Sequence, residues 1–168
     1  MSEIVNRVAQ SKLITFDLEE LYPEGKRTVL DIKDWLYEGF ILREKEFRSY
    51  LEAVDWAVYQ DNYVALTCSS DAIVPGWAFM LVTAKLNPFA KKVMVGDLET
   101  LETSLYQEKL EKLDVSSFAD KPVIIKGCSN KPVPQNAYLM AITKIQQVAK
   151  SVMYGEACSS VPLYKKKK

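Results

Sequence analysis

The sequence predicts a single α/β domain of three layers, built on a mostly parallel sheet. Short apolar runs recur at a regular interval, amphipathic helical segments separate them, and the runs do not alternate between polar and apolar residues. An interval of about 30 residues is typical of a βαβ unit. Strands without alternation are typical of parallel sheets that helices cover on both faces. We therefore expect one domain over residues 1–164, with an N-terminal extension over 1–60, a βαβαβαβ core over 61–164 and a basic tail over 165–168.

The N-terminal extension is expected to contain two short strands and one helix. Residues 13–18 alternate as LITFDL, and residues 27–32 form a second extended run. The Tyr-Pro-Glu-Gly sequence at 22–25 is a turn signal between them, which predicts a hairpin or a pair of edge strands. Apolar residues at helical spacing then predict a helix over about residues 43–54.

The core is expected to contain four strands connected by three helices. The strand candidates are residues 63–67, 93–95, 123–126 and 152–154. Pro75 and Pro134 suit the first turn of the first and third helices. Asp97 suits the N-cap of the second. Right-handed crossovers would place all four strands in one parallel sheet. We expect only the order of strands and helices to recur, and we do not expect the amino-acid sequence itself to repeat.

Composition excludes several classes of function. The sequence contains no histidine, which rules out Ser-His-Asp and Cys-His catalysis and imidazole ligands. Its 22 basic and 22 acidic residues balance, so no overall field favours nucleic acid. No secretory signal or membrane-spanning run is evident, which predicts a cytoplasmic protein. The sequence has three cysteines, an odd number, and thiols stay reduced in the cytosol, so a disulfide framework is not expected.

Three cysteines, each followed by a serine, stand just after strand candidates. They are Cys68, Cys128 and Cys158. If the strands are parallel and in one sheet, their carboxyl ends share one edge, where α/β sheets bind ligands. Three thiolates with one further ligand can hold zinc, and thiolates also hold iron–sulfur clusters. The sequence therefore predicts a zinc or iron–sulfur site. The alternative is that each cysteine is a small, half-buried residue at a strand end.

Further polar residues at the same strand ends complete this predicted site. Asp97 and Glu156 are the candidates for a fourth ligand, although Asp97 also suits a helix N-cap. A surrounding layer of hydrogen-bonding and cationic groups would comprise Ser69, Ser129, Ser159 and Lys126. No nucleotide-binding glycine motif is present, so no nucleotide cofactor is predicted.

Two other classes of function remain open. One is a metal-free thiol enzyme or a small-molecule-binding protein that uses the same pocket. The other is a non-catalytic interaction module, in the form of a homodimer that contacts through an aromatic surface around Trp35 and Trp56. Neither nucleic acid nor a membrane is expected as a partner.

Several segments resemble one known family over nearly the whole chain. They read LREKEFR, CSSDAIVPGWAFM, GDLETLE, KGCSNKPVP and YGEACSSVPLYK, and only the final lysines lie outside the pattern. The chain resembles an uncharacterised bacterial family of unknown function, DUF2480. The resemblance supplies no catalytic residues. It favours a role in metal or iron–sulfur handling, with a protein partner in that process.

Overall fold

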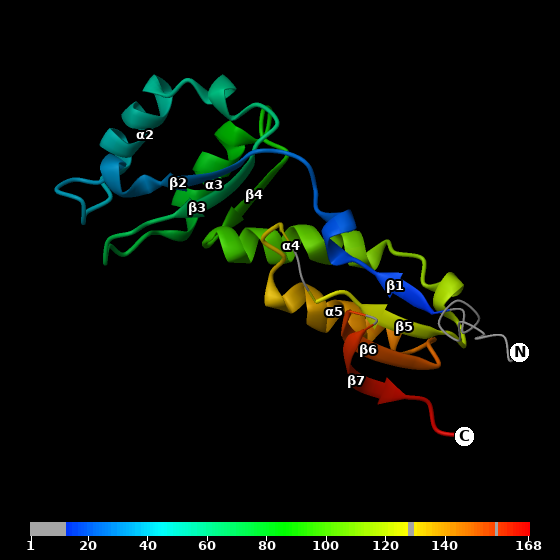
Figure 1. Cartoon of the computed structure of the whole chain (residues 1–168). Coiled ribbons are helices and arrows are strands. Elements are labelled where there is room, and N and C mark those ends of the chain that lie inside the picture. The colour runs from blue at the N-terminus through cyan, green and yellow to red at the C-terminus, as the bar shows by residue number, and fades with distance from the viewer. Residues whose placement is uncertain (1–12, 128–129, 157) are drawn as a thin grey trace, which may run out of the picture. The chain divides into compact units, whose positions relative to one another are not determined.

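Two compact units make up the structure, a computed structural model that describes residues 13–127, 130–156 and 158–168. Unit 2 is the continuous stretch Glu24–Glu102. Unit 1 combines the chain up to Pro23 with Thr103–Lys168. Along the chain, unit 2 is therefore inserted between two parts of unit 1 (Figure 1).

Unit 2 is built on a parallel sheet with the strand order β2-β3-β4. Its elements are β2 (Arg27–Asp31), η2 (Ile32–Trp35), α2 (Glu44–Ala53), η3 (Trp56–Tyr59), β3 (Tyr63–Thr67), α3 (Gly76–Leu86) and β4 (Lys92–Val95). The helix α4 (Leu98–Glu111) begins in unit 2 and ends in unit 1.

Unit 1 has a four-stranded sheet with the order β1-β5-β6-β7. Its elements are β1 (Ile14–Phe16), η1 (Leu18–Leu21), η4 (Ser116–Phe118), β5 (Pro122–Ile125), α5 (Gln135–Ile145), β6 (Ser151–Glu156) and β7 (Ser159–Lys165). The strands β1, β5 and β6 are parallel, and β7 pairs antiparallel with β6.

Each unit has its own hydrophobic core between one face of its sheet and two helices. In unit 2, Leu66 of β3 packs with Phe47 of α2 and Val82 of α3. In unit 1, Ile125 of β5 packs with Tyr106 of α4 and Ala141 of α5. Apolar residues spaced at helical intervals form these buried stripes, which is why the helices form where the sequence predicts them.

The predicted α/β class with a mostly parallel four-stranded sheet is confirmed, but the predicted sheet membership is wrong. The strands at 63–67 and 92–95 lie in one sheet, and those at 122–125 and 151–156 lie in the other. Of the two alternatives for the first two strands, the pair of edge strands is confirmed and the hairpin is wrong, because β1 and β2 are edge strands of different sheets. Regular spacing along the chain fixes the length of a βαβ unit but not which strands share hydrogen bonds.

The two units share a weak sequence repeat at a fixed shift, which the sequence prediction did not include. A shift of 59 residues brings α3 onto α5 and β4 onto the start of β6, with no gap between Phe47 and Gly96. The residues preserved at this shift include Val74-Pro75 with Val133-Pro134, Ala90-Lys91 with Ala149-Lys150, Val93-Met94 with Val152-Met153, and Gly96 with Gly155. Most other aligned positions hold different residues in the two units, so a search for shared motifs does not reveal the repeat.

Several backbone features repeat at the same shift. The Ala78 and Ala137 amides donate to the carbonyls of Pro75 and Pro134, both at 3.0 Å. Asp61 and Asp120 both take positive φ, 60° and 56°. Their amides donate to the carbonyls of Phe89 and Val148, both at 2.9 Å. The buried helix residues also correspond, with Ala78, Val82 and Leu86 in α3 matching Ala137, Ala141 and Ile145 in α5. Unit 1 and unit 2 are therefore two copies of one fold.

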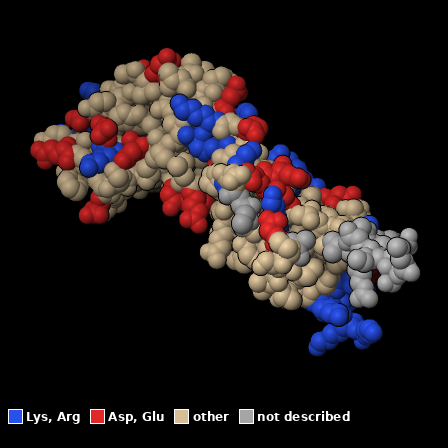
Figure 2. Space-filling view, in the orientation of Figure 1, with Lys and Arg blue, Asp and Glu red and all other residues tan. Residues whose placement is uncertain are grey.

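The basic C-terminal end begins inside β7 instead of following the domain as a frayed tail. Lys165 is the last residue of β7, and the Lys166 amide donates to the Lys150 carbonyl at 2.8 Å. Figure 2 shows the terminal lysines together at this end of the chain. Separately, the helices of the described residues are all too short or too polar to cross a membrane.

Candidate functional site

The structure places the two described cysteines in different units. Cys68 follows β3 in unit 2, and Cys158 lies between β6 and β7 in unit 1. Cys128 lies outside the described residues. The prediction of one shared sheet edge is therefore wrong, because the strands that carry these cysteines belong to two sheets.

The described cysteines have ordinary surroundings. The Cys68 thiol is half-buried, packs against the core of unit 2 and lies 3.4 Å from the Ser70 hydroxyl oxygen. Cys158 is exposed. Among the described residues, no three His, Cys, Asp or Glu side chains are grouped so that they could hold a metal ion. The geometry of the described chain thus gives the metal hypothesis no direct support.

The two candidate carboxylate ligands also have local roles. Asp97 is an N-cap, because its carboxylate accepts the Thr100 amide at 2.8 Å and the Thr100 hydroxyl at 2.9 Å. These two hydrogen bonds from Thr100 hold the pKa of Asp97 below its ordinary value. Glu156 is the exposed last residue of β6. Asp97 and Glu156 are equivalent positions in the two copies, one in each unit.

The residues predicted to surround a metal instead connect loops to acidic N-caps. The Ser69 amide donates to Asp31 at 3.1 Å, and Lys126 donates to Asp17 at 3.4 Å. Burial alone would raise the pKa of Asp31, but its hydrogen bonds with Ser69 and Lys33 outweigh that and lower it. The hydrogen bond and charge of Asp17 raise the pKa of Lys126.

Of the two remaining serines, Ser159 begins β7 and is exposed, whereas Ser129 lies outside the described residues.

Asp17 and Asp31 are equivalent residues that the sequence reasoning missed. Asp17 follows β1 and Asp31 is the last residue of β2. Each caps a 3-10 helix by accepting an amide hydrogen two residues later, at 2.9 and 3.0 Å. Each also reaches the loop after the central strand of its sheet. The signal that could have identified them is the shared pattern of an apolar residue, aspartate and another apolar residue at 16–18 and 30–32.

The predicted aromatic contact surface around Trp35 and Trp56 is part of the core of unit 2. Trp56 is only 9% exposed, and its indole N–H donates to the Leu51 carbonyl at 2.9 Å. Trp35 makes edge-on contacts with Trp56 and Phe47, each with ring centroids 6.1 Å apart. Phe47 continues this aromatic run to Trp77, at 6.0 Å. Trp56 is buried and Trp35 is partly buried against it, so this aromatic cluster packs mainly within unit 2.

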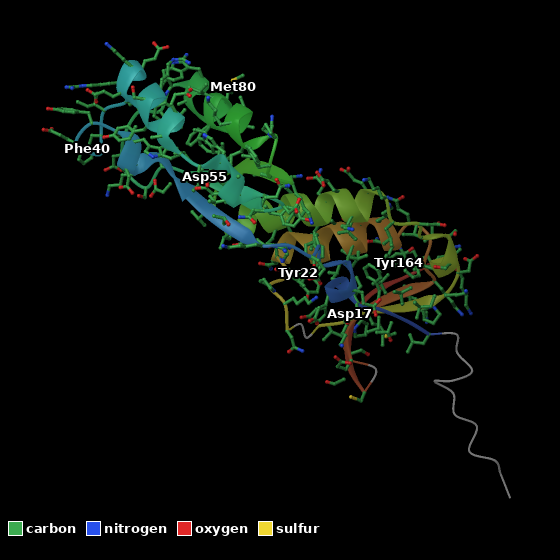
Figure 3. All side chains as sticks on the ribbon, turned by 90° about the horizontal axis from the view of Figure 1, so that it is seen from above. Asp17, Tyr22, Phe40, Asp55, Met80 and Tyr164 are labelled. Carbon is green, nitrogen blue, oxygen red and sulfur yellow. The ribbon has the colours of Figure 1, made fainter. Side chains whose placement is uncertain are left out.

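Unit 2 instead exposes apolar side chains on the outer face of α3, defined here as Gly76, Trp77, Met80 and Ala84. Met80 is 72% exposed, and its side chain reaches outward from the ribbon in Figure 3. Trp77 is 37% exposed. Ile73, in the loop just before α3, is 92% exposed.

The equivalent face of α5 is mostly polar. Its residues are Gln135, Asn136, Leu139 and Thr143. Both helices present the same kind of buried stripe to their sheets, so the fold does not require an apolar outer face. A helix that is apolar all round is ordinarily covered on every side. The outer face of α3 is therefore the more apolar of two equivalent helix faces, which makes it a candidate surface for binding.

Each unit also has a groove between its helix pair, at equivalent positions. The groove between α4 and α5 has a volume of about 530 Å³, and that between α2 and α3 about 120 Å³. Lys144 and Lys85 line the two grooves. Lys144 donates to the Leu110 carbonyl at 2.6 Å, and Lys85 pairs with Glu52 at 2.8 Å. These contacts hold the helix pairs together, so the lysines serve the fold.

Comparison with known proteins agrees with the resemblance seen in the sequence. No curated protein and no solved structure matches the chain. The family model described as "Protein of unknown function (DUF2480)" matches residues 2–166. With nearly the whole length matched, the chain belongs to the DUF2480 family.

Proposed function

We propose that the protein is a non-catalytic interaction module that self-associates through the outer face of α3. The observation that carries this proposal is the difference between α3 and α5. The two helices occupy equivalent places in two copies of one fold, yet only α3 combines Trp77, Met80 and Ala84 on its exposed side. Tryptophan and methionine are enriched in the centres of protein interfaces.

The shape of this face suits a second helix. Gly76 and Ala84 are small, and Trp77 and Met80 stand between them along the helix. Close packing of two helices depends on large side chains entering spaces beside small ones. Removing the apolar side chains from water supplies the driving force at about 25 cal/mol per Å².

Charge favours a second copy of this chain as the partner. The outer face of α3 consists of Gly76, Trp77, Met80 and Ala84, so it carries no charge. Charged side chains near it are already compensated, since Arg48 pairs with Glu44 at 3.2 Å and Lys85 with Glu52 at 2.8 Å. A symmetric dimer brings identical surfaces together, and like charges would oppose it. A neutral face with internally paired neighbours avoids that repulsion.

Replacement of Met80 by lysine tests the proposal, with Leu139→Lys as the matched control. Both side chains are exposed, at 72% and 57%, and they are equivalent positions on α3 and α5. We expect the parent protein and Leu139→Lys to dimerise with increasing concentration in analytical ultracentrifugation. We expect Met80→Lys to remain a monomer, because a charge would be buried in an apolar contact.

Circular dichroism and thermal melting would verify that both variants fold. A parent protein that stays monomeric at every concentration would contradict the proposal. Equal dimerisation of both variants would contradict the choice of α3.

Binding of zinc or an iron–sulfur cluster by Cys68, Cys128 and Cys158 stays a prediction from the sequence. Metal analysis of anaerobically purified protein tests it. If it is correct, stoichiometric metal is present and is lost in a triple Cys→Ser variant. Metal-free protein in which all three thiols titrate freely would contradict it. Because Met80 is exposed on the outer face of α3 and is not one of the predicted ligands, Met80→Lys should leave any bound metal in place.

A further inference from the structure

The internal repeat shows that, within the described residues, one sheet edge is covered in unit 1 but unpaired in the equivalent sheet of unit 2. β4 and β6 are equivalent strands. After β6 the chain returns as β7 and pairs antiparallel with it. After β4 the chain continues into α4 instead, so within its sheet β4 pairs only with β3. Among the described residues, no strand pairs with the second edge of β4.

The hydrogen-bonding pattern identifies which groups of β4 point to the open edge. The Gly96 amide donates to the Leu66 carbonyl at 2.9 Å, so Gly96 faces β3. Because a parallel ladder uses alternate residues, Val93 and Val95 direct their N–H and C=O groups to the opposite side. Their equivalents in unit 1, Val152 and Tyr154, pair with β7. Val95 is also 54% exposed.

β4 lacks devices that ordinarily protect an edge strand. In unit 1 the outermost strand, β7, contains Pro162, and the β6–β7 pairing has a register shift at Val152/Met153. β4 contains no proline, and its pairing with β3 is regular. Its remaining protection is its short length and Lys92 at its start. An unprotected edge is a template for another strand.

We propose that β4 pairs with β4 of a second copy in antiparallel orientation, so that the two β2-β3-β4 sheets become one continuous sheet. This pairing rests on the self-association proposed above and specifies its geometry. A two-fold axis at Met94 places Val93 opposite Val95 of the second copy, and Val95 opposite Val93. These are the residues whose backbone groups face outward, so both pairs can exchange hydrogen bonds.

Charge complementarity supports this register. The segment reads Lys91-Lys92-Val93-Met94-Val95-Gly96-Asp97, with cations at one end and an anion at the other. Antiparallel pairing about Met94 brings Lys91 opposite Asp97 of the second copy, on both sides of the axis. Opposite charges across strands stabilise a pair, whereas parallel pairing of the same segment would place like charges together.

Substitution of Val95 tests the pairing through its outward amide. Val95→Pro removes that N–H without removing a hydrogen bond to β3, and Val95→Thr keeps it as a matched control. We expect Val95→Pro to be monomeric in analytical ultracentrifugation and Val95→Thr to dimerise like the parent. Circular dichroism checks that both remain folded.

A cysteine cross-link tests the register without using proline. In a background with Cys68, Cys128 and Cys158 changed to Ser, Met94→Cys would place two thiols across the two-fold axis. Their Cα atoms would be about 4.5 Å apart, within the range that a disulfide spans. Lys92→Cys is the control, because its two copies would lie roughly 13 Å apart. With oxidised glutathione, we expect a disulfide-linked dimer from Met94→Cys alone.

The outcomes separate this inference from the proposed function. If Met80→Lys is monomeric but Val95→Pro dimerises and Met94→Cys does not cross-link, self-association through α3 stands and the β4 pairing is overturned. If the parent protein is monomeric, both are overturned. Cross-linking of Lys92→Cys as readily as Met94→Cys would also overturn the register.

Discussion

Replacement of Glu102 by alanine is expected to destabilise the protein by about 3–5 kcal/mol, because it leaves a buried arginine without its carboxylate. Arg27 and Glu102 form a bidentate pair, with Nε–Oε1 at 2.5 Å and Nη2–Oε2 at 3.2 Å. Their side chains are only 10% and 6% exposed. The Arg27 guanidinium also donates to the Gly25 carbonyl and lies over the Tyr63 ring, so it cannot easily turn to water. Urea unfolding of the full chain measures the loss.

The exposed pair of Arg48 and Glu44 provides the control for this prediction. Their side chains are 55% and 62% exposed. Glu44→Ala should therefore cost only about 0.3–0.5 kcal/mol, as for other surface pairs one helical turn apart. A double replacement of Arg27 and Glu102 by apolar residues should recover much of the loss, since no buried charge then remains. Equal effects of Glu102→Ala and Glu44→Ala would contradict the assignment of a buried pair.

Replacement of Phe47 by alanine is expected to destabilise the protein by about 3–5 kcal/mol, because it opens a cavity in the core of unit 2. Phe47 is fully buried and lies between Trp35 and Trp77 in the aromatic run. Urea unfolding followed by tryptophan fluorescence measures both the stability and the surroundings of these indoles.

Tyr50, on the same helix, is the control for Phe47. It is 48% exposed, so Tyr50→Ala should change stability by no more than about 0.5 kcal/mol. The repeat extends the prediction to Tyr106, which is equivalent to Phe47 and also fully buried. Tyr106→Ala should be as costly, since it also removes the hydroxyl that donates to the Leu18 carbonyl at 3.0 Å. A small effect of both core replacements would contradict the predicted cavity cost, and a large effect of only one of them would contradict the equivalence of the two cores.

Local sequence signals predicted the helices well. The expected helix over residues 43–54 is α2, Glu44–Ala53. Pro75 and Pro134 stand immediately before α3 and α5, and Asp97 accepts the Thr100 amide at the start of α4. These features depend on capping and on helical periodicity, which involve neighbours in the chain.

The strand β7 was missed for the opposite reason. Its sequence, SSVPLYK, contains a proline and begins with serines, which are not typical of a strand. It forms a strand because Val161 and Tyr164 find partners on β6, and Pro162 is tolerated where an edge strand needs no outward amide. Residues 159–165 therefore form a strand because they pair with β6, and not because of their own sequence pattern.

The predicted functional site differs more from the structure than the predicted fold does. Cys68 and Cys158 do follow strands, as predicted, but sharing an edge required those strands to share a sheet. The outer face of α3 could have been noticed in the sequence, because the segment GWAFMLVTAKL has one charged residue. What the sequence reading lacked was the comparison with α5, which depends on knowing that the two helices are equivalent.

The amino-acid sequence alone determined the α/β class, the positions of the helices and the absence of histidine chemistry, because these follow from composition and from contacts between residues close in the chain. Only the tertiary structure decided that β1 pairs with β5 and β2 with β3. This pairing divides the strands between two sheets and leaves one edge of β4 without a partner strand in the part of the chain that the structure describes. Strands of similar length and hydrophobicity can satisfy their backbone hydrogen bonds with many neighbours. The choice among those neighbours depends on how all the side chains pack together.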